Sequence, residues 1–171
     1  MKSVFLIYHL VAVLLAAIAL WSMRHELNEK ATIRLAWVVP PALAVVVAAI
    51  LLIVSPGKRF ELWAVGIALG LAIGLGAGTI LKVNKDFERK LVRVHRAWDG
   101  VGAAALLLLA ALARVVSSDV VTRQSGKFGV LGASAAFLAA YLVGRAISMY
   151  FYNAPRTIHL DMIWRERART S

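Results

Sequence analysis

The chain has 171 residues, of which 61% are hydrophobic, yet it carries 20 lysines and arginines against 9 acidic residues, a formal charge of +11. Soluble domains hold about 45–50% apolar residues, and disordered chains hold fewer. The mean hydropathy of +0.76 therefore excludes a disordered chain and a soluble nucleic-acid-binding domain. The absence of cysteine excludes disulfides, thiolate metal sites, CxxC redox centres and thioether-bound haem.

Long uncharged runs separate the charged segments, and a run of about 20 apolar residues can cross the roughly 30 Å of membrane hydrocarbon. Five runs qualify, over residues 4–23, 35–54, 62–81, 101–120 and 128–152. Backbone groups in lipid must be paired internally, so these runs are expected to be helices. The sequence predicts an all-α fold, a five-helix transmembrane bundle over residues 1–155 with a cytoplasmic tail over 156–171.

The basic residues predict the orientation of these five spans. With the N-terminus outside, thirteen lysines and arginines fall in inner segments and five in outer segments, while Arg114 and Arg145 lie within spans. Cytoplasmic loops carry the excess of basic residues. We therefore expect a multi-pass protein with its N-terminus outside and its C-terminus inside.

The run over 62–81 contains four glycines at a spacing of four residues, Gly66, Gly70, Gly74 and Gly78. This spacing places them along one side of a helix, where another backbone can approach closely. A similar stripe of small residues ends at Gly144 in the last span. The glycines are thus predicted to serve helix packing, either between these two spans or in a homodimer or partner interface, with ligand lining as the remaining alternative.

Pro40 and Pro41 lie near the start of the second run. Each lacks an N–H, and its ring crowds the carbonyl four residues back. We expect either a kink in this helix, which could open a cavity near the inner membrane face, or a late start with a shortened first turn.

The segment 84–100 is the largest inner-face feature. Phe87, Leu91, Val94 and Trp98 recur at helical spacing, which is typical of an amphipathic helix on anionic headgroups, but alternation over 91–98 also permits a β-hairpin. With either form, a membrane-surface role is expected for the basic residues and one tryptophan of this segment: Lys85, Arg89, Lys90, Arg93, Arg96 and Trp98. The basic residues are divided among three segments at a membrane face, so no nucleic-acid partner is expected.

No acidic residue lies at the centre of a span, which disfavours proton-coupled carriers and paired-carboxylate catalysis in the membrane. The four histidines show no HxxxH or HExxH spacing, and His9 lies at a different depth from the other three. Neither a haem, another cofactor nor a metal site is expected. No phosphate-binding loop or nucleophile motif is present, so the sequence favours a non-enzymatic protein.

Several short motifs from Arg34 onward resemble the CcdC-like family of small bacterial integral membrane proteins. They are WVVPP at 37–41, Ser55-Pro56, the glycine segment 66–70, LARV at 112–115 and GRAISMY at 144–150. The resemblance implies a bacterial cytoplasmic (inner) membrane location and a setting near cytochrome biogenesis or respiration, with no established reaction. It also directs attention to Arg114, Arg145 and Tyr150.

Arginine within a span costs about 2.5–3.5 kcal/mol at mid-bilayer on insertion scales. Arg114 and Arg145 are therefore expected either to reach the interface with their long side chains or, with Tyr150, to hold an anion such as a lipid phosphate. The favoured function is contact with membrane lipids, a second copy or a partner protein through helix packing. The alternatives are a binding or transport protein for a small anionic or lipid ligand, and an intramembrane enzyme acting on an anionic lipid-linked substrate.

Overall fold

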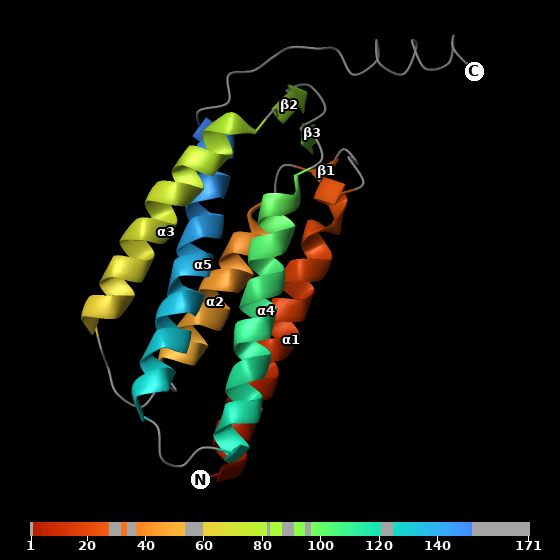
Figure 1. Ribbon diagram of the computed structural model, residues 1–171. Coiled ribbons are helices and arrows are strands. Elements are labelled where there is room, and N and C mark those ends of the chain that lie inside the picture. Colours follow the sequence, from red (N-terminus) through yellow and green to blue (C-terminus); the bar gives the residue numbers. More distant parts are fainter. Residues whose placement is uncertain are drawn as a thin grey trace.

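The computed structural model describes residues 2–27, 32–33, 37–53, 60–81, 83–86, 91–94, 97–120 and 125–151. Within these ranges five helices run alternately up and down one bundle (Figure 1). They are α1 (Lys2–Leu27), α2 (Val39–Ile53), α3 (Phe60–Ile80), α4 (Trp98–Val120) and α5 (Ser125–Phe151). The helical bundle is thus as predicted, and the tail over 156–171 lies outside the described residues.

Three short strands lie at one end of the bundle: β1 (Thr32–Ile33), β2 (Val83–Asp86) and β3 (Leu91–Val94). They form an antiparallel sheet in the order β1-β3-β2, with Asp86 opposite Leu91 in the β2–β3 pair. Of the two forms that the sequence permits for this segment, residues 91–94 adopt the β-strand, and the prediction of an amphipathic helix there is wrong. We refer to this end of the bundle as the sheet end and to the opposite end as the far end.

Helix α2 begins at Val39, so Pro40 and Pro41 occupy its first turn and are buried. The N–H groups of a first turn have no partner within the helix, so proline there removes no helical hydrogen bond. Of the two expected alternatives, the structure shows the late start with the prolines in the first turn. The resulting 15 residues rise only about 22 Å.

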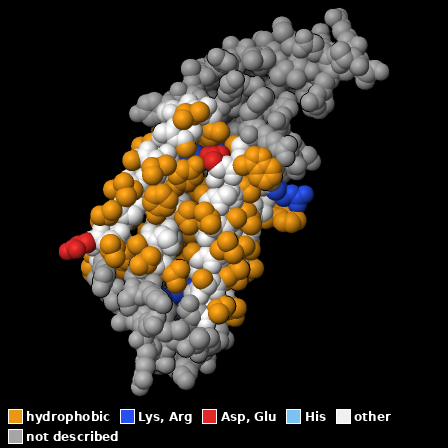
Figure 2. Space-filling model, viewed as in Figure 1, with side chains coloured by type: hydrophobic (Ala, Val, Ile, Leu, Met, Phe, Trp, Pro, Cys, Tyr) orange, Lys and Arg blue, Asp and Glu red, His pale blue; other side chains and the backbone are white. Residues whose placement is uncertain are grey.

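Four of the described helices are long and apolar enough to cross a membrane: Ile7–Arg24, Phe60–Ile80, Trp98–Val116 and Val130–Phe151. Large apolar side chains such as Leu14, Leu109 and Ile73 are exposed on their outer faces. Hydrophobic side chains cover most of the described surface seen in Figure 2, with few charges among them. A surface of this kind is typical of helices that face lipid.

Small side chains dominate the interior. The buried face of α1 runs through His9, Ala12, Ala16, Ala19 and Met23, at alternating steps of three and four residues. Such steps keep one face of a helix toward its neighbours. Because lipid tails are as apolar as leucine, burying a large apolar side chain gives little drive for helices to associate in a membrane. Alanine instead stabilises the bundle by letting the helices approach closely.

Helices α3 and α5 make the closest contact in the bundle. A Cβ atom added at Gly66 would lie 2.9 Å from the carbonyl oxygen of Ala133, and one at Gly78 would lie 2.6 Å from that of Arg145. Gly70 and Gly74 face the backbone of α5 even more closely, and Gly144 faces that of α3. The predicted packing glycines therefore lie within a single chain's α3–α5 interface, where any side chain would force the two backbones apart.

Candidate functional site

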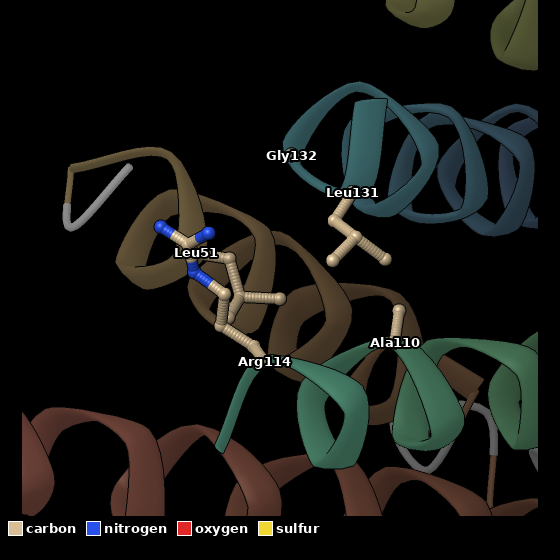
Figure 3. A pocket seen from close by; sticks show the side chains of 5 residues that line it. All are labelled: Leu51, Ala110, Arg114, Leu131 and Gly132. Atoms are coloured by element: carbon tan, nitrogen blue, oxygen red, sulfur yellow. The ribbon is translucent and has the colours of Figure 1, made fainter. Parts of the chain in front are cut away.

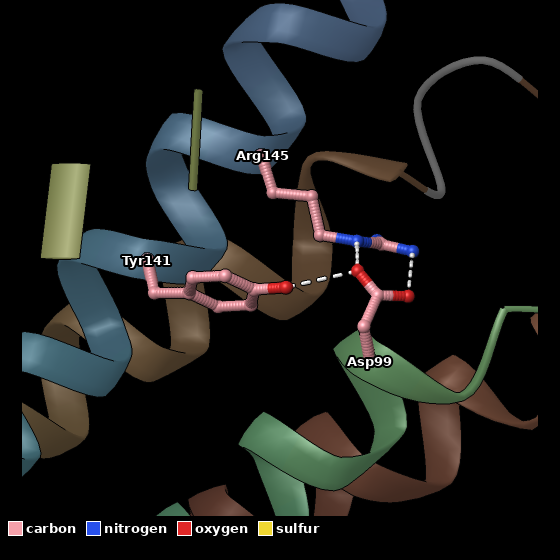
Figure 4. A network of polar contacts seen from close by, with 3 residues as sticks. All are labelled: Asp99, Tyr141 and Arg145. Atoms are coloured by element: carbon pink, nitrogen blue, oxygen red, sulfur yellow. Dashed lines mark hydrogen bonds and ion pairs between the residues drawn. The ribbon is translucent and has the colours of Figure 1, made fainter. Parts of the chain in front are cut away.

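Arg145 forms the most extensive polar network described in the bundle (Figure 4). Its Nε donates to Oδ2 of Asp99 at 2.7 Å, and its Nη2 donates to Oδ1 at 3.3 Å. The hydroxyl of Tyr141 donates to the same Oδ2 at 2.9 Å. Asp99 comes from the first turn of α4 and the other two residues from α5, so the network joins these helices at the sheet end.

The two partners of this ion pair differ in exposure. The side chain of Arg145 is 3% exposed, whereas that of Asp99 is 33% exposed. The guanidinium is therefore enclosed by the bundle, and the carboxylate lies between it and the surroundings. A two-pronged carboxylate contact therefore holds the Arg145 side chain within the bundle at the sheet end.

Arg114 is also buried, at 4% exposure, but near the far end. It lies six residues before the end of α4, about 9 Å along the helix. Its side chain reaches from α4 toward Leu51 of α2 and lines a small hollow (Figure 3). Arg114 is therefore enclosed by neighbouring helices rather than extended over the surface.

The hollow holds about 160 Å³ of empty space, part of it open to the surroundings. Its other walls are Leu51, Ala110, Leu131 and Gly132, from α2, α4 and α5. No sphere the size of a water molecule fits in this hollow, so the side chains around Arg114 are packed together rather than lining a cavity.

Both buried arginines lie along one boundary, where α5 meets α2 and α4. We call this boundary the α5 seam. Asp99, which marks the position of Arg145, precedes Arg114 by fifteen residues on α4, or about 22 Å. The sequence placed both arginines in spans, and the structure brings both of them to the same seam, one at each end.

Tyr150 lies apart from this seam network. It is exposed on α5 and stacks edge-on against Phe151, with ring centroids 4.8 Å apart. Tyr141 donates to the carboxylate instead. The three residues predicted to bind a ligand therefore do not lie together. Arg114 is near the far end, Arg145 is at the sheet end, and Tyr150 is on the outer surface of α5.

The membrane-surface residues are described only in part. Trp98 is exposed at the start of α4, and Lys85 and Arg93 lie in β2 and β3, where the backbone alone is described. Arg89, Lys90 and Arg96 lie outside the described residues. Within the described residues, no three histidine or acidic side chains are grouped to hold a metal ion.

Asp99 and Tyr141 are the site residues that the sequence analysis missed. Asp99 lies two residues before the run predicted to begin at 101, whereas the observed α4 begins at Trp98 and includes it. Tyr141 lies four residues before Arg145, which puts both on the same face of a helix. An acid just before one span, together with a Tyr-x-x-x-Arg pair in another, was the available signal.

Comparisons with known proteins return no match among family models, curated proteins or solved structures.

Proposed function

We propose that this chain is a five-span protein of the bacterial cytoplasmic membrane that acts through helix packing, with the outward face of α3 binding a second copy. The setting near cytochrome biogenesis or respiration is proposed from the CcdC-like motifs. The observation that carries the packing function is the peripheral position of α3. This helix packs against α5 and has no other substantial helix contact in the described bundle.

The outward face of α3 has a small-residue stripe of its own. Ala64, Ala68, Ala72 and Gly76 are all exposed and recur every four residues. Around Gly76, no described atom would lie within 4 Å of an added Cβ. These four small residues are each offset by two positions from the glycines that face α5. Two positions correspond to about 200° of helix rotation, so the two sets lie on roughly opposite sides of α3. A second backbone could approach this face as α5 approaches the other.

Exposed aromatic side chains support the placement of the bundle across a membrane. Trp21, Trp98 and Phe151 lie at the sheet end, and Tyr8 and Phe60 lie toward the far end. Tryptophan and tyrosine concentrate at the two membrane–water interfaces. The alternating direction of the helices supports α2 as the fifth span, with the sheet end, where the basic segment 84–100 begins, on the cytoplasmic side.

The dimer is tested by cross-linking in native membranes, using the natural absence of cysteine. We expect Ala72→Cys to give a disulfide-linked species of twice the chain mass on oxidation. Leu109→Cys is the matched control, because it lies on the exposed face of α4. Adding Gly76→Leu to Ala72→Cys should abolish the product. A monomer alone, or an adduct of another mass, would overturn the proposed dimer.

A further inference from the structure

The side of α1 that faces away from the bundle carries an apolar stripe that ends beside a basic residue. The members of the stripe are exposed and recur at steps of three or four residues: Ile7, Leu10, Leu14, Ile18 and Trp21. Such steps keep them on one side of the helix, roughly opposite the buried face through which α1 packs against α2 and α4. We call them the α1 outer stripe. Arg24 lies three residues after its last member and is exposed as well.

The guanidinium of Arg24 is held in place by the stripe itself. Its Cζ lies 4.3 Å from the centroid of the Trp21 ring, in the range where the ring face attracts a cation. Trp21 is 69% exposed, so the pair lies on the outside of the bundle. A contact with a ring face positions the long side chain without supplying an oxygen acceptor for its N–H groups. In the described part of the chain, no carboxylate pairs with Arg24.

The length of the helix places this pair at the membrane surface. The apolar part of α1 runs from Ile7 to Arg24, which is about 26 Å along the helix and close to the roughly 30 Å of membrane hydrocarbon. With the α1 outer stripe in the hydrocarbon, Arg24 lies at the level of the phosphate groups of the lipids. Trp21 lies one turn deeper, in the zone where tryptophan concentrates.

We propose that the α1 outer stripe is a binding site for an anionic phospholipid of the leaflet at the sheet end. The lipid phosphate binds Arg24, its glycerol region contacts Trp21, and one acyl chain lies along Ile18 and Leu14. The planar fork of the guanidinium matches the geometry of a phosphate. Leu14 is about 15 Å from Arg24 along the helix, which is half the hydrocarbon thickness and therefore within reach of one acyl chain. The site is independent of the dimer on α3.

The distribution of charge favours an anionic lipid over a zwitterionic one. Of the three arginine side chains that the structure describes, Arg114 and Arg145 are buried and Arg24 is exposed. A lipid beside the described outer faces thus meets mainly apolar side chains, and at Arg24 it meets a positive charge. A zwitterionic lipid carries its own ammonium group, which the guanidinium repels. An anionic lipid lacks this repulsion and gains the full attraction of its phosphate.

Quenching by brominated lipids tests the site directly, because Trp21 is part of it. A reporter protein keeps Trp21 and has phenylalanine at the other four tryptophan positions, with its helical content checked by circular dichroism. It is reconstituted in phosphatidylcholine bilayers that contain brominated phosphatidylglycerol or, in parallel, brominated phosphatidylcholine. We expect phosphatidylglycerol to be enriched about fivefold beside Trp21, which corresponds to about 1 kcal/mol. Both lipids carry bromine at the same acyl position, so their ratio removes the effect of depth.

Substitutions at position 24 show whether the enrichment depends on the guanidinium. In the reporter, Arg24→Gln should lower the enrichment to about one, and Arg24→Lys should retain most of it. The matched control carries Leu109→Trp as its single tryptophan, exposed on the outer face of α4. There we expect no enrichment and no effect of Arg24→Gln. Equal enrichment beside Trp21 with arginine and glutamine would overturn the site. The absence of quenching by either lipid would also overturn it, because protein would then cover the stripe.

Two further measurements identify the occupant and avoid the tryptophan substitutions. Inorganic phosphate added to the reporter should not restore the fluorescence, because it has no acyl chain to lie along the stripe. Restoration would assign Arg24 to a free anion and overturn the lipid site. Native mass spectrometry of the unaltered protein should show more retained phosphatidylglycerol than that of Arg24→Gln. Equal retention by the two proteins would contradict the proposal.

Discussion

The α3–α5 interface allows the contribution of close backbone approach to be measured with two glycines two residues apart. At Gly74, an added Cβ would lie 2.9 Å from the carbonyl carbon of Tyr141 and 3.0 Å from the backbone nitrogen of Arg145. Carbon contacts are ordinarily about 3.5–4.0 Å, so the helices would have to separate by about 0.5–1 Å. No described atom lies that close to Gly76, which faces outward.

The two substitutions share every effect except packing. Gly→Ala in a helix is favourable by about 1 kcal/mol through backbone entropy, and this gain applies at both positions. Overpacking costs about 1–3 kcal/mol, and it applies only at Gly74 because backbone atoms cannot rotate away. We therefore expect Gly74→Ala to be less stable than Gly76→Ala by about 1–3 kcal/mol.

The assay is unfolding of purified protein in mild detergent micelles by added dodecyl sulfate, followed by circular dichroism at a dilution where the protein is monomeric. Wild type gives the reference, and the difference between the two variants gives the packing contribution. A difference below about 0.5 kcal/mol, the usual range for surface changes, would refute the account of the α3–α5 interface given above.

Three further predictions concern the ion pair, a buried hydroxyl and the topology. Asp99→Asn should lower the free energy of unfolding by about 3 kcal/mol, because it leaves the buried guanidinium of Arg145 without its charged partner. Arg145→Gln should lower it by less, because the Asp99 carboxylate that remains is a third exposed. Detergent unfolding compares the two variants, and equal losses would contradict the buried-charge argument. Ser148→Ala should leave stability unchanged or raise it by about 1 kcal/mol, since the fully buried Oγ has no hydrogen-bond partner within the described residues, and a clear loss in the same assay would contradict this. Single cysteines at Ser3 and Ser171 should react with an impermeant maleimide from opposite sides of the membrane, and labelling from one side would refute five spans.

The helices could be predicted from the sequence because the membrane imposes a length and a period on each run. The predicted starts at residues 62 and 101 lie within three residues of the observed starts at Phe60 and Trp98. The glycines could be assigned to packing because their spacing is local information. The start of α2 could not be fixed in the same way, because apolar residues continue before Val39 and only the prolines mark the first turn.

The partners of the arginines could not be predicted, because they depend on which helices meet. Asp99 and Arg145 are 46 residues apart, and no spacing rule connects them. The predicted run also starts three residues after the observed start of α4 at Trp98, so Asp99 falls outside the predicted span. The strand at 91–94 was undecided for a related reason: its pattern fits two periods, and pairing with β1 and β2 selects one.

The attachment of α3 to α5 has a consequence for biogenesis. During synthesis α3 emerges before α4 and α5, and 44 residues separate Ile80 from the start of α5 at Ser125. At a synthesis rate of about 5–20 residues per second, the glycine face of α3 has no partner for several seconds after α3 is made, because α5 has not yet been synthesised. The helices α1 and α2 can pair as soon as both have been inserted, whereas α3 depends on the last helix made. The bundle can therefore reach its final packing only after α5 has been completed. A chain released earlier would leave the glycine face of α3 without a packing partner, where proteases and chaperones could recognise it.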